Sequence, residues 1–504
     1  MKLSLIKQNP ISLVFFAALF VIMALLITQF SLGFLVFIIL GLGLAILSIY
    51  KIEYGILALA IYIPFEPFLL KFVSNDIYPY DRFAGEELLL ILLFVVILKR
   101  LIKKDFKLIK TPIDLPFILF ILVALVSMIW NFNPLHIGLL GLRQTLRFII
   151  LFYAAVYAGL KKETIKKIIW ILLVVVLFEV LIGLGQVVVG EGASDFLMSQ
   201  PRKVFGLEST EVGGEFYASG QRIFATLGRY DKFGTFLCFF ILISLGLAYE
   251  LRKSRIFKFL LGLILLSIPT LILSYSRMSW IGFALGLGLI SIWIKKDKRV
   301  LIGFVSLIIF LSSYFLFTNI RISKIENRPK MTIQERFLEM FSPQHIKWSY
   351  QGKGRLYFII QTPIKVVRHS PIFGVGPGMY GGGVVTALHN TEVYDKLGLP
   401  FGAEGVRGEI DNSWFSIWGE YGTLGLILFL WIIISLFKYT LNIYRKSRDR
   451  FTRGLALGYL GAIGAVSLQS FLGPYFEVRT LVLYFWLIGG LIVSLGIKET
   501  LNNN

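Results

Sequence analysis

Long apolar runs follow one another through nearly the whole chain, and they decide what it can fold into. Each run is about 17 to 25 residues long, which lets a helix cross the roughly 30 Å of hydrocarbon in a bilayer. The 504-residue chain is 56% hydrophobic and 16% charged, whereas about 25% of the residues in a soluble domain are charged. Strands of a membrane barrel would alternate polar and apolar side chains. The sequence therefore predicts an all-α, polytopic membrane protein.

The apolar runs predict about fourteen transmembrane helices within a single membrane domain, residues 1–504. They cover residues 11–30, 32–50, 55–73, 86–102, 112–130, 143–160, 166–189, 232–249, 257–275, 279–295, 300–318, 413–437, 454–472 and 479–497. The first run is long for the core of a signal peptide and lacks a small-x-small cleavage site, so we expect it to be retained as a helix. Pro64, Glu66 and Pro67 leave the third run open to a broken or re-entrant geometry.

Basic residues orient the predicted helices. Alternate connections are rich in lysine and arginine, as in the KRLIKKDFKLIK segment from Lys99 and the KKDKR segment from Lys295. By the positive-inside rule, these connections and both termini are cytoplasmic. Two long segments are then external: a smaller loop over residues 191–231 and a large subdomain over residues 319–413, between predicted helices 11 and 12. Orientation in a membrane, and not nucleic-acid binding, thus explains the net charge of +21.

Cysteine and histidine give little support for metal or disulfide chemistry. Cys238 is the one cysteine of this sequence, which excludes an intrachain disulfide and a cysteine-based metal site. The histidines His136, His345, His369 and His389 fall in external segments with a spacing that matches no metal motif. We expect them to be solvent-exposed structural residues.

Arginines gather on the predicted external side, where the positive-inside rule expects few. They are Arg82, Arg143, Arg147, Arg222, Arg229, Arg277, Arg355 and Arg407. Burying a guanidinium near hydrocarbon is costly, so such residues usually face water or a fixed anion, and phosphate suits the guanidinium fork. As a set they predict an anionic ligand such as a lipid-linked phosphate or diphosphate. The alternative for each one is that it reaches lipid head groups or pairs with Glu86, Asp231 or Glu409.

Asp411 is the most suggestive external carboxylate, because it lies where the large loop enters a predicted helix near Trp414. It can act as the N-cap of that helix or as a catalytic base, and one carboxylate can do both. With Glu409 it can also offer oxygen ligands to a divalent cation, although so short a pattern is a weak signal and we expect no cofactor. The nearby GVGPGMYGGG stretch lacks the ending of a P-loop. We expect a tight turn there, or a close approach of the backbone to a ligand.

Four segments, in this order, resemble the superfamily of O-antigen ligases and O-antigen polymerases. They are QRIFATLG, LSYSRMSW, GRLYFIIQTPIKVVRHSPIFGVGPGMY and DNSWFSIWGEYGTLG, within residues 222–430. The resemblance implies a GT-C-like glycosyltransferase in the bacterial cytoplasmic membrane. Its donor would be an oligosaccharide on a polyprenyl diphosphate such as undecaprenyl diphosphate, and its acceptor a glycan or lipid on the outer face. Membrane lipids and other polysaccharide assembly proteins are the further partners that it implies.

The resemblance also implies roles for individual residues. Arg222, Arg277 and Arg355 would hold the diphosphate, and we add Arg143 and Arg147 because of their position at an external helix end. Asp411 would orient or deprotonate the acceptor hydroxyl while the arginines stabilise the departing diphosphate. This mechanism needs no metal.

One departure from the family bears on the reaction. Ligases of the family have His-Asn where this chain has Asp411 and Asn412, which favours a polymerase and leaves ligase-type transfer as the alternative. His389 is also followed by asparagine, but it lies 22 residues before Asp411 and lacks the following helix start. It is a minor candidate, as are Glu409, Asn412 and Arg407.

A transporter or flippase for lipid-linked sugars is an alternative from another class, and a structural partner in polysaccharide export is a third. A transporter predicts inverted repeats and a site near the bilayer midplane. The sequence has no visible repeat, and its arginines gather at the external helix ends. We therefore expect transfer chemistry.

Overall fold

The chain folds into helices, as predicted, in a computed structural model that describes residues 32–75, 77–104, 108–198, 203–204, 207–208, 222–318 and 332–501. A short antiparallel hairpin joins β1 (Lys203–Val204) to β2 (Leu207–Glu208), with Val204 opposite Leu207. The predicted first span, residues 11–30, lies outside the described residues.

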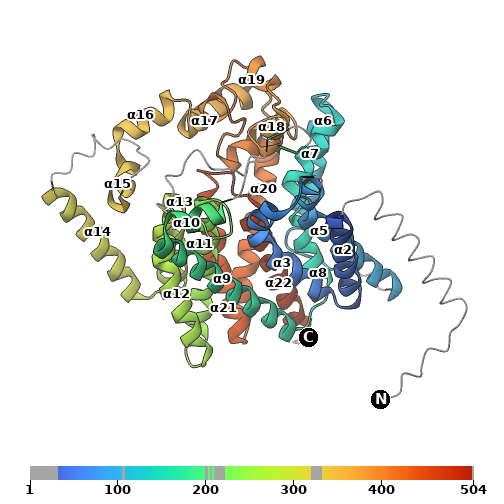
Figure 1. The fold of residues 1–504 in the computed structure, drawn as a ribbon, viewed down its shortest axis with the longest axis vertical. Helices are drawn as coiled ribbons and strands as arrows, with labels where there is room; N and C mark the ends of the chain where they lie inside the picture. Colours follow the sequence, from blue (N-terminus) through green and yellow to red (C-terminus); the bar gives the residue numbers. More distant parts are fainter. Residues whose placement is uncertain are drawn as a thin grey trace, which may run out of the picture.

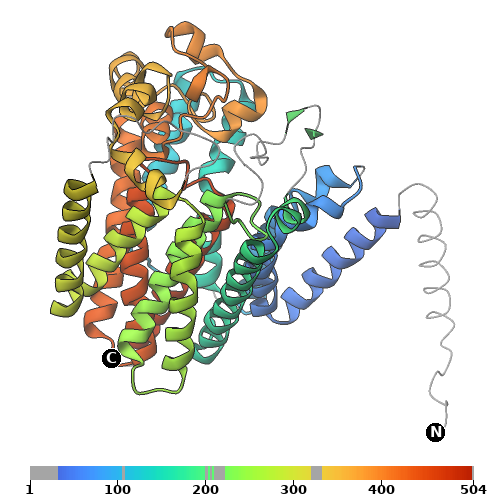
Figure 2. The ribbon, with the colours of Figure 1, turned by 60° about the vertical axis from the view of Figure 1, so that its left-hand side comes forward.

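Long helices run alongside one another and form the membrane part of the molecule (Figures 1 and 2). Every predicted run from residue 32 onwards falls on helix, and the run 143–160 is divided between two helices. They are α2 (Leu32–Tyr50), α3 (Ile52–Leu69), α5 (Ala84–Ile102), α6 (Asp114–Trp130), α7 (Leu135–Leu146), α8 (Ile149–Tyr157), α9 (Lys162–Val189), α11 (Tyr230–Glu250), α12 (Ile256–Leu273), α13 (Arg277–Leu287) with its π-helical extension η3 (Gly288–Ile294), α14 (Lys298–Thr318), α20 (Ser413–Lys446), α21 (Arg450–Gln469) and α22 (Arg479–Leu501). Short helices between them are η1 (Leu70–Phe72), α4 (Tyr78–Asp81) and α10 (Glu191–Leu197).

The described residues contain eight helices that are long and apolar enough to cross a membrane, or nine if the bent pair α7 and α8 counts as one span. The multi-pass membrane architecture is confirmed, but the predicted number of fourteen spans is not. The prediction of one helix over residues 143–160 is wrong. Helix α7 begins at Leu135, and the chain bends by 53° between α7 and α8.

Helix α3 is continuous through Pro64 and Pro67, so the broken geometry considered for the third run is not found. Pro64 lacks the N–H that would bond to the carbonyl of Ala60. The hydroxyl of Tyr484 on α22 donates to that carbonyl instead, at 2.5 Å. A neighbouring helix therefore satisfies the backbone group that proline leaves unpaired, as a membrane span requires.

Helices α11, α21 and α22 form the most enclosed part of the membrane domain. The closest contact is between α11 and α21, where a Cβ added to Gly246 would come within 2.1 Å of the backbone nitrogen of Gly458. Small residues allow this backbone approach, which drives helix packing in membranes.

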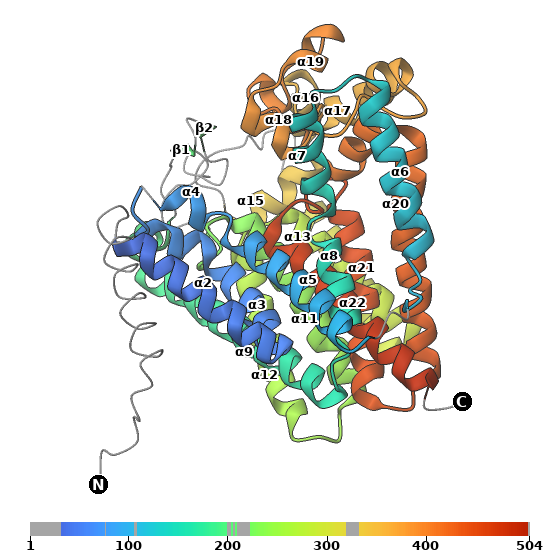
Figure 3. The same cartoon turned by 90° about the vertical axis from the view of Figure 1, so that its right-hand side faces the viewer.

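Residues 332–412 form a layer of short helices at one end of the long ones (Figures 1 to 3). Its elements are α15 (Ile333–Leu338), η5 (Glu339–Phe341), α16 (Pro343–Gln351), α17 (Arg355–Gln361), η6 (Thr362–Val367), α18 (Gly383–Leu388), α19 (Glu392–Lys396) and η7 (Ala403–Gly405). This layer has its own apolar cluster around Phe358, Tyr380 and Tyr394. The segments TIQERFLEMF and GRLYFIIQTPIKVVRH both form short helices in this layer.

The glycine-rich stretch fastens this layer to the start of α20. Gly374, Gly376 and Gly378 all have positive φ angles, and the Gly378 N–H donates to Glu420 Oε1 at 2.9 Å. A Cβ on Gly374 would come within 2.4 Å of the nitrogen of Gly422, where α20 is kinked. The expected tight turn is confirmed, and the close approach here is between two backbone segments. An approach of this backbone to a ligand stays a prediction.

Candidate active site

Asn412, and not Asp411, caps helix α20. The Asn412 side chain accepts a hydrogen bond from the Phe415 N–H at 3.1 Å and donates to the Phe471 carbonyl at 2.8 Å. Asp411 has a left-handed backbone, with φ of 51°, and its carboxylate pairs with Arg355 (Nε to Oδ2, 3.2 Å). Of the two roles considered for Asp411, capping is therefore taken by its neighbour.

The Arg355–Asp411 pair joins the short-helix layer to the start of α20. Burial lowers the pKa of Arg355, but the Asp411 carboxylate outweighs that effect and holds the pKa above its usual range. The two side chains are 40% and 19% exposed, respectively. Both side chains are therefore still within reach of a ligand.

Arg277 begins α13 and pairs with a fully buried carboxylate, Glu339 of η5 (3.2 Å). The same carboxylate binds Arg336 at 2.6 Å and His345 at 3.2 Å. Burial and the positive charge of Arg277 lower the pKa of His345, which favours the neutral imidazole beside Glu339. The prediction that His345 is solvent-exposed is wrong, and the sequence analysis missed Arg336 and Glu339.

Arg222 and Arg229 flank the turn that leads into α11. The Arg222 guanidinium lies over the Tyr230 ring, 4.7 Å from its centre, and Arg229 binds both oxygens of Asp231 at 3.0 Å. Pairing with Asp231, one of the alternatives considered, is therefore observed for Arg229. Tyr230 also interacts electrostatically with Arg355.

These contacts bring together Arg222, Arg277 and Arg355, as predicted, with two further arginines. Arg355 acts electrostatically on both Arg277 and Asp231, which links the three groups of contacts. We call the five arginines the central arginine cluster; they are Arg222, Arg229, Arg277, Arg336 and Arg355. They face three carboxylates, Asp231, Glu339 and Asp411. Among the side chains of this cluster that the structure describes, positive charges therefore outnumber negative charges by two.

Glu409 lies close to Asp411, and a further carboxyl group, Glu477, lies close to Glu409. Burial, with the charge of Asp411 adding to it, raises the pKa of Glu409 to about 7. Burial and the charge of Glu409 raise the pKa of Glu477 to about 8, and Glu477 Oε2 accepts a hydrogen bond from the Gly383 N–H at 3.1 Å. Both groups can therefore hold a proton near neutral pH. Glu477 was missed because no local pattern marks it.

The remaining minor candidates have other partners. Arg407 pairs with Glu404 at 3.1 Å, and the His389 ring packs on Phe401 with 4.5 Å between ring centres. Neither contact joins the central arginine cluster.

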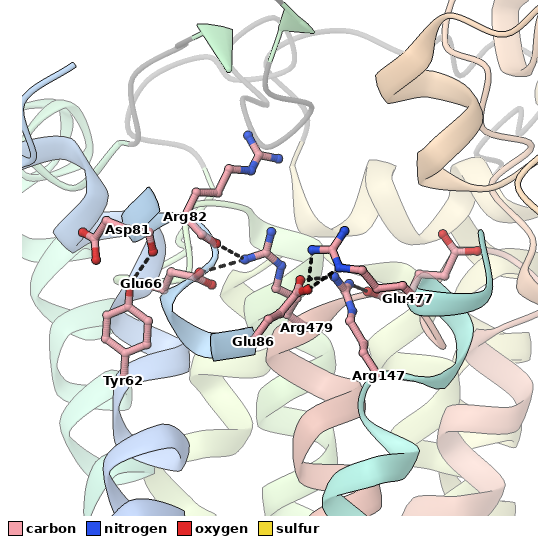
Figure 4. Close-up of polar contacts among 9 residues, drawn as sticks. Tyr62, Glu66, Asp81, Arg82, Glu86, Arg147, Glu477 and Arg479 are labelled. Atoms are coloured by element: carbon pink, nitrogen blue, oxygen red, sulfur yellow. Dashed lines mark hydrogen bonds and ion pairs between the residues drawn. The ribbon is translucent and has the colours of Figure 1, made fainter. Parts of the chain in front are cut away.

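Arg143 and Arg147 belong to a second group of ion pairs, shown in Figure 4. Arg143 Nε and Arg147 Nη1 bind the two oxygens of Glu86 at 2.6 and 2.7 Å. Beside them, Arg479 binds Glu66 at 2.8 Å. We call these five residues the Glu86 cluster. For Arg143 and Arg147 the structure thus shows the alternative considered above, which is pairing with Glu86.

The part of the chain that the structure describes contains no group of three or more His, Cys, Asp or Glu side chains placed to hold a metal ion. Of the pair considered as cation ligands, Asp411 is bound to Arg355. A cation at Glu409 and Asp411 stays a prediction.

A comparison with known protein families finds a match over a region that contains several of these residues. Residues 262–430 match the O-antigen ligase family. The matched third of the chain holds α13, the short-helix layer and the start of α20, with Arg277, Arg355 and Asp411. The resemblance to the O-antigen ligase and polymerase superfamily is confirmed over this region, which is similar to membrane glycosyltransferases of that kind. No curated protein matches the chain.

Proposed function

We propose that the protein is a glycosyltransferase of the bacterial cytoplasmic membrane that polymerises glycan units carried on a polyprenyl diphosphate. The observation that carries the proposal is the central arginine cluster. Its two excess positive charges lie beside Asp411 and at the ends of membrane helices. A diphosphate whose lipid tail stays in the bilayer suits this charge and this position.

On the donor side, Arg222, Arg277 and Arg355 bind the diphosphate. Negative charge builds up on the diphosphate as its bond to the sugar breaks. Guanidinium groups already held by Glu339 and Asp411 stabilise that charge without having to reorganise.

On the acceptor side, Asp411 orients the hydroxyl and takes its proton. The hydroxyl oxygen forms a bond to the anomeric carbon of the donor sugar, and the bond from that carbon to the diphosphate oxygen breaks. The electron pair leaves with the diphosphate. The contact with Arg355 places the Asp411 carboxylate beside the guanidinium that binds the diphosphate, so that acceptor and donor meet at one point.

Ligase-type transfer to a lipid or protein acceptor is the second candidate, and the family match favours it. The Asp411–Asn412 pair, which stands where ligases have His-Asn, favours polymerisation. Donor and membrane side are the same in both.

Reconstitution of the purified protein in liposomes with a polyprenyl-diphosphate oligosaccharide tests the proposal. A ladder of product lengths on a gel is expected for a polymerase. A single transferred unit would indicate a ligase. Movement of the lipid across the bilayer with no new glycosidic bond would indicate a flippase and overturn both candidates.

A further inference from the structure

The segment over residues 222–229 is a buried turn between long helices that has no regular secondary structure. Ala225 and Gly228 have positive φ angles of 48° and 75°. Ile223 and Leu227 are buried. Such a turn is stable among membrane helices only if other groups satisfy its backbone polar atoms. Arg222 and Arg229 lie at its two ends.

Helix α9 supplies most of the acceptors that this turn needs. Gln186 Oε1 accepts from the N–H groups of Phe224 and Ala225, at 3.0 and 2.6 Å. Glu179 Oε2 accepts from the Thr226 N–H at 3.2 Å. Three consecutive N–H groups are thus bound by two side chains of one helix.

The hydrogen bonds of the Thr226 hydroxyl indicate the protonation state of Glu179. The Thr226 hydroxyl has one hydrogen, yet it lies 2.5 Å from Glu179 Oε1 and 3.0 Å from the Pro64 carbonyl. All these contacts are satisfied when Glu179 carries a proton and donates to the hydroxyl, which then donates to Pro64. A neutral Glu179 also agrees with its complete burial.

The two side chains are fixed on one face of α9. Glu179 and Gln186 are seven residues apart, or about two helical turns. Gly183 lies between them, and a Cβ there would come within 2.9 Å of the Phe233 ring on α11. Helix α9 is therefore seated against the helix that continues from the turn.

We propose that Glu179 and Gln186 are positioning residues that hold the 222–229 turn, and through it Arg222, at the diphosphate site. This role rests on the proposed function, because it assigns Arg222 to a diphosphate. A merely structural role for the two residues would predict lower stability with no specific coupling to Arg222.

The test combines binding with hydrogen–deuterium exchange on the full-length protein in detergent. Variants are Glu179→Leu, Glu179→Gln, Thr226→Val and Gln186→Leu, each alone and with Arg222→Ala. The ligand is undecaprenyl diphosphate. Thr440→Val is the matched control, because Thr440 is also fully buried. It lies near the C-terminal end of α20, whereas the candidate site is at the N-terminal end of that helix.

Glu179→Leu, Thr226→Val and Gln186→Leu are expected to weaken binding about tenfold, since each lost contact is worth roughly 1.4 kcal/mol. Exchange of the amides of residues 223–227 should rise. Glu179→Gln should retain affinity, because its amide can donate to Thr226 Oγ1 and accept from the Thr226 N–H. Adding Arg222→Ala should cause little further loss, since the two changes act on one interaction.

Independent losses that multiply in the double variants would overturn the proposal, as would faster exchange at residues 223–227 with unchanged affinity. If Glu179→Leu does not fold, Thr226→Val and Gln186→Leu remove the same anchoring contacts and decide the matter. If the wild-type protein does not bind undecaprenyl diphosphate, the proposed function fails and the positioning role with it. Exchange at residues 223–227 then still shows whether α9 holds the turn.

Discussion

The central arginine cluster and the Glu86 cluster are built from the same kind of residue at the same end of the helices, but their charges are used differently. In the central cluster five arginines share three carboxylates. In the Glu86 cluster, Arg143, Arg147 and Arg479 face Glu66 and Glu86, which leaves a smaller excess. The first cluster can neutralise a diphosphate, while the second mainly ties helices together.

Exposure varies within each cluster and does not by itself separate them. In the central arginine cluster, the side chains of Arg355 and Arg229 are 40% and 35% exposed, but those of Arg277 and Arg336 are 17% and 7% exposed. In the Glu86 cluster, those of Arg147 and Arg479 are 13% exposed and that of Arg143 is 36% exposed. The excess of positive charge, more than exposure, therefore marks the central arginine cluster as the candidate for binding a ligand.

The largest expected effect is on turnover at the edge of the central cluster. Asp411→Asn should lower the rate of polymer formation by about 10²- to 10⁴-fold, the contribution of a general base, with donor affinity retained. Gel analysis of product length over time measures the rate. Glu404→Gln, which changes an acid of the same segment that pairs with Arg407, is the control. Full activity in a folded Asp411→Asn protein would show that Asp411 is not the general base.

Next in size is the stability effect expected in the Glu86 cluster. Arg147→Ala leaves Glu86 buried with one partner fewer, and breaking a buried pair costs about 3 kcal/mol. The thermal unfolding midpoint should fall while the affinity for undecaprenyl diphosphate stays the same. Arg407→Ala, which breaks a more exposed pair, should cost less than about 1 kcal/mol. A tenfold loss of affinity for undecaprenyl diphosphate in Arg147→Ala would show that the Glu86 cluster also contributes to ligand binding.

The central cluster should show the opposite pattern. Arg277→Ala removes a charged contact worth about 1.5–3 kcal/mol, so the dissociation constant for undecaprenyl diphosphate should rise about 10- to 100-fold. Arg368→Ala, at an exposed arginine of the short-helix layer, should leave it unchanged. Equal affinities for Arg277→Ala and the wild-type protein would reduce Arg277 to a structural partner of Glu339.

The smallest effect is a pH dependence of stability. Glu477 has a pKa raised to about 8 from an ordinary value of 4.5, so the folded state holds its proton more tightly than the unfolded state. This contribution is fully present below pH 4.5 and is lost as the pH rises towards 8. Glu477→Gln should therefore flatten the fall of the unfolding midpoint between pH 5 and pH 8.5, by a few degrees. An unchanged slope would show that Glu477 ionises normally.

Much of the fold follows from the sequence, because a membrane span is specified locally by its length and apolarity. The runs from residue 32 onwards are helical, except that residues 143–160 are divided between α7 and α8, and the glycine-rich stretch forms a turn. The bend between α7 and α8 was missed because residues 143–160 contain no proline, which is the usual sequence mark of a kink.

The site was harder to predict, because its ion pairs join distant parts of the chain. Arg143 and Arg147 meet Glu86 across 57 and 61 residues, and no local pattern distinguishes them from Arg222. Arg336 and Glu339, in contrast, are three residues apart, but their meeting with Arg277 depends on tertiary packing. Glu179 could have been recognised from the sequence, since an ionisable residue inside an apolar run is a functional candidate by default.

The left-handed backbone at residue 411 determines which residues can replace Asp411 without changing the loop. Apart from glycine, the residues that adopt this conformation most readily are asparagine, aspartate and histidine, and two of these three can accept a proton. The backbone conformation therefore restricts the residue types at position 411, independently of any catalytic requirement. A chain with aspartate here and relatives with histidine can share one loop shape, and a saturation library at position 411 should return folded proteins mainly from that short set.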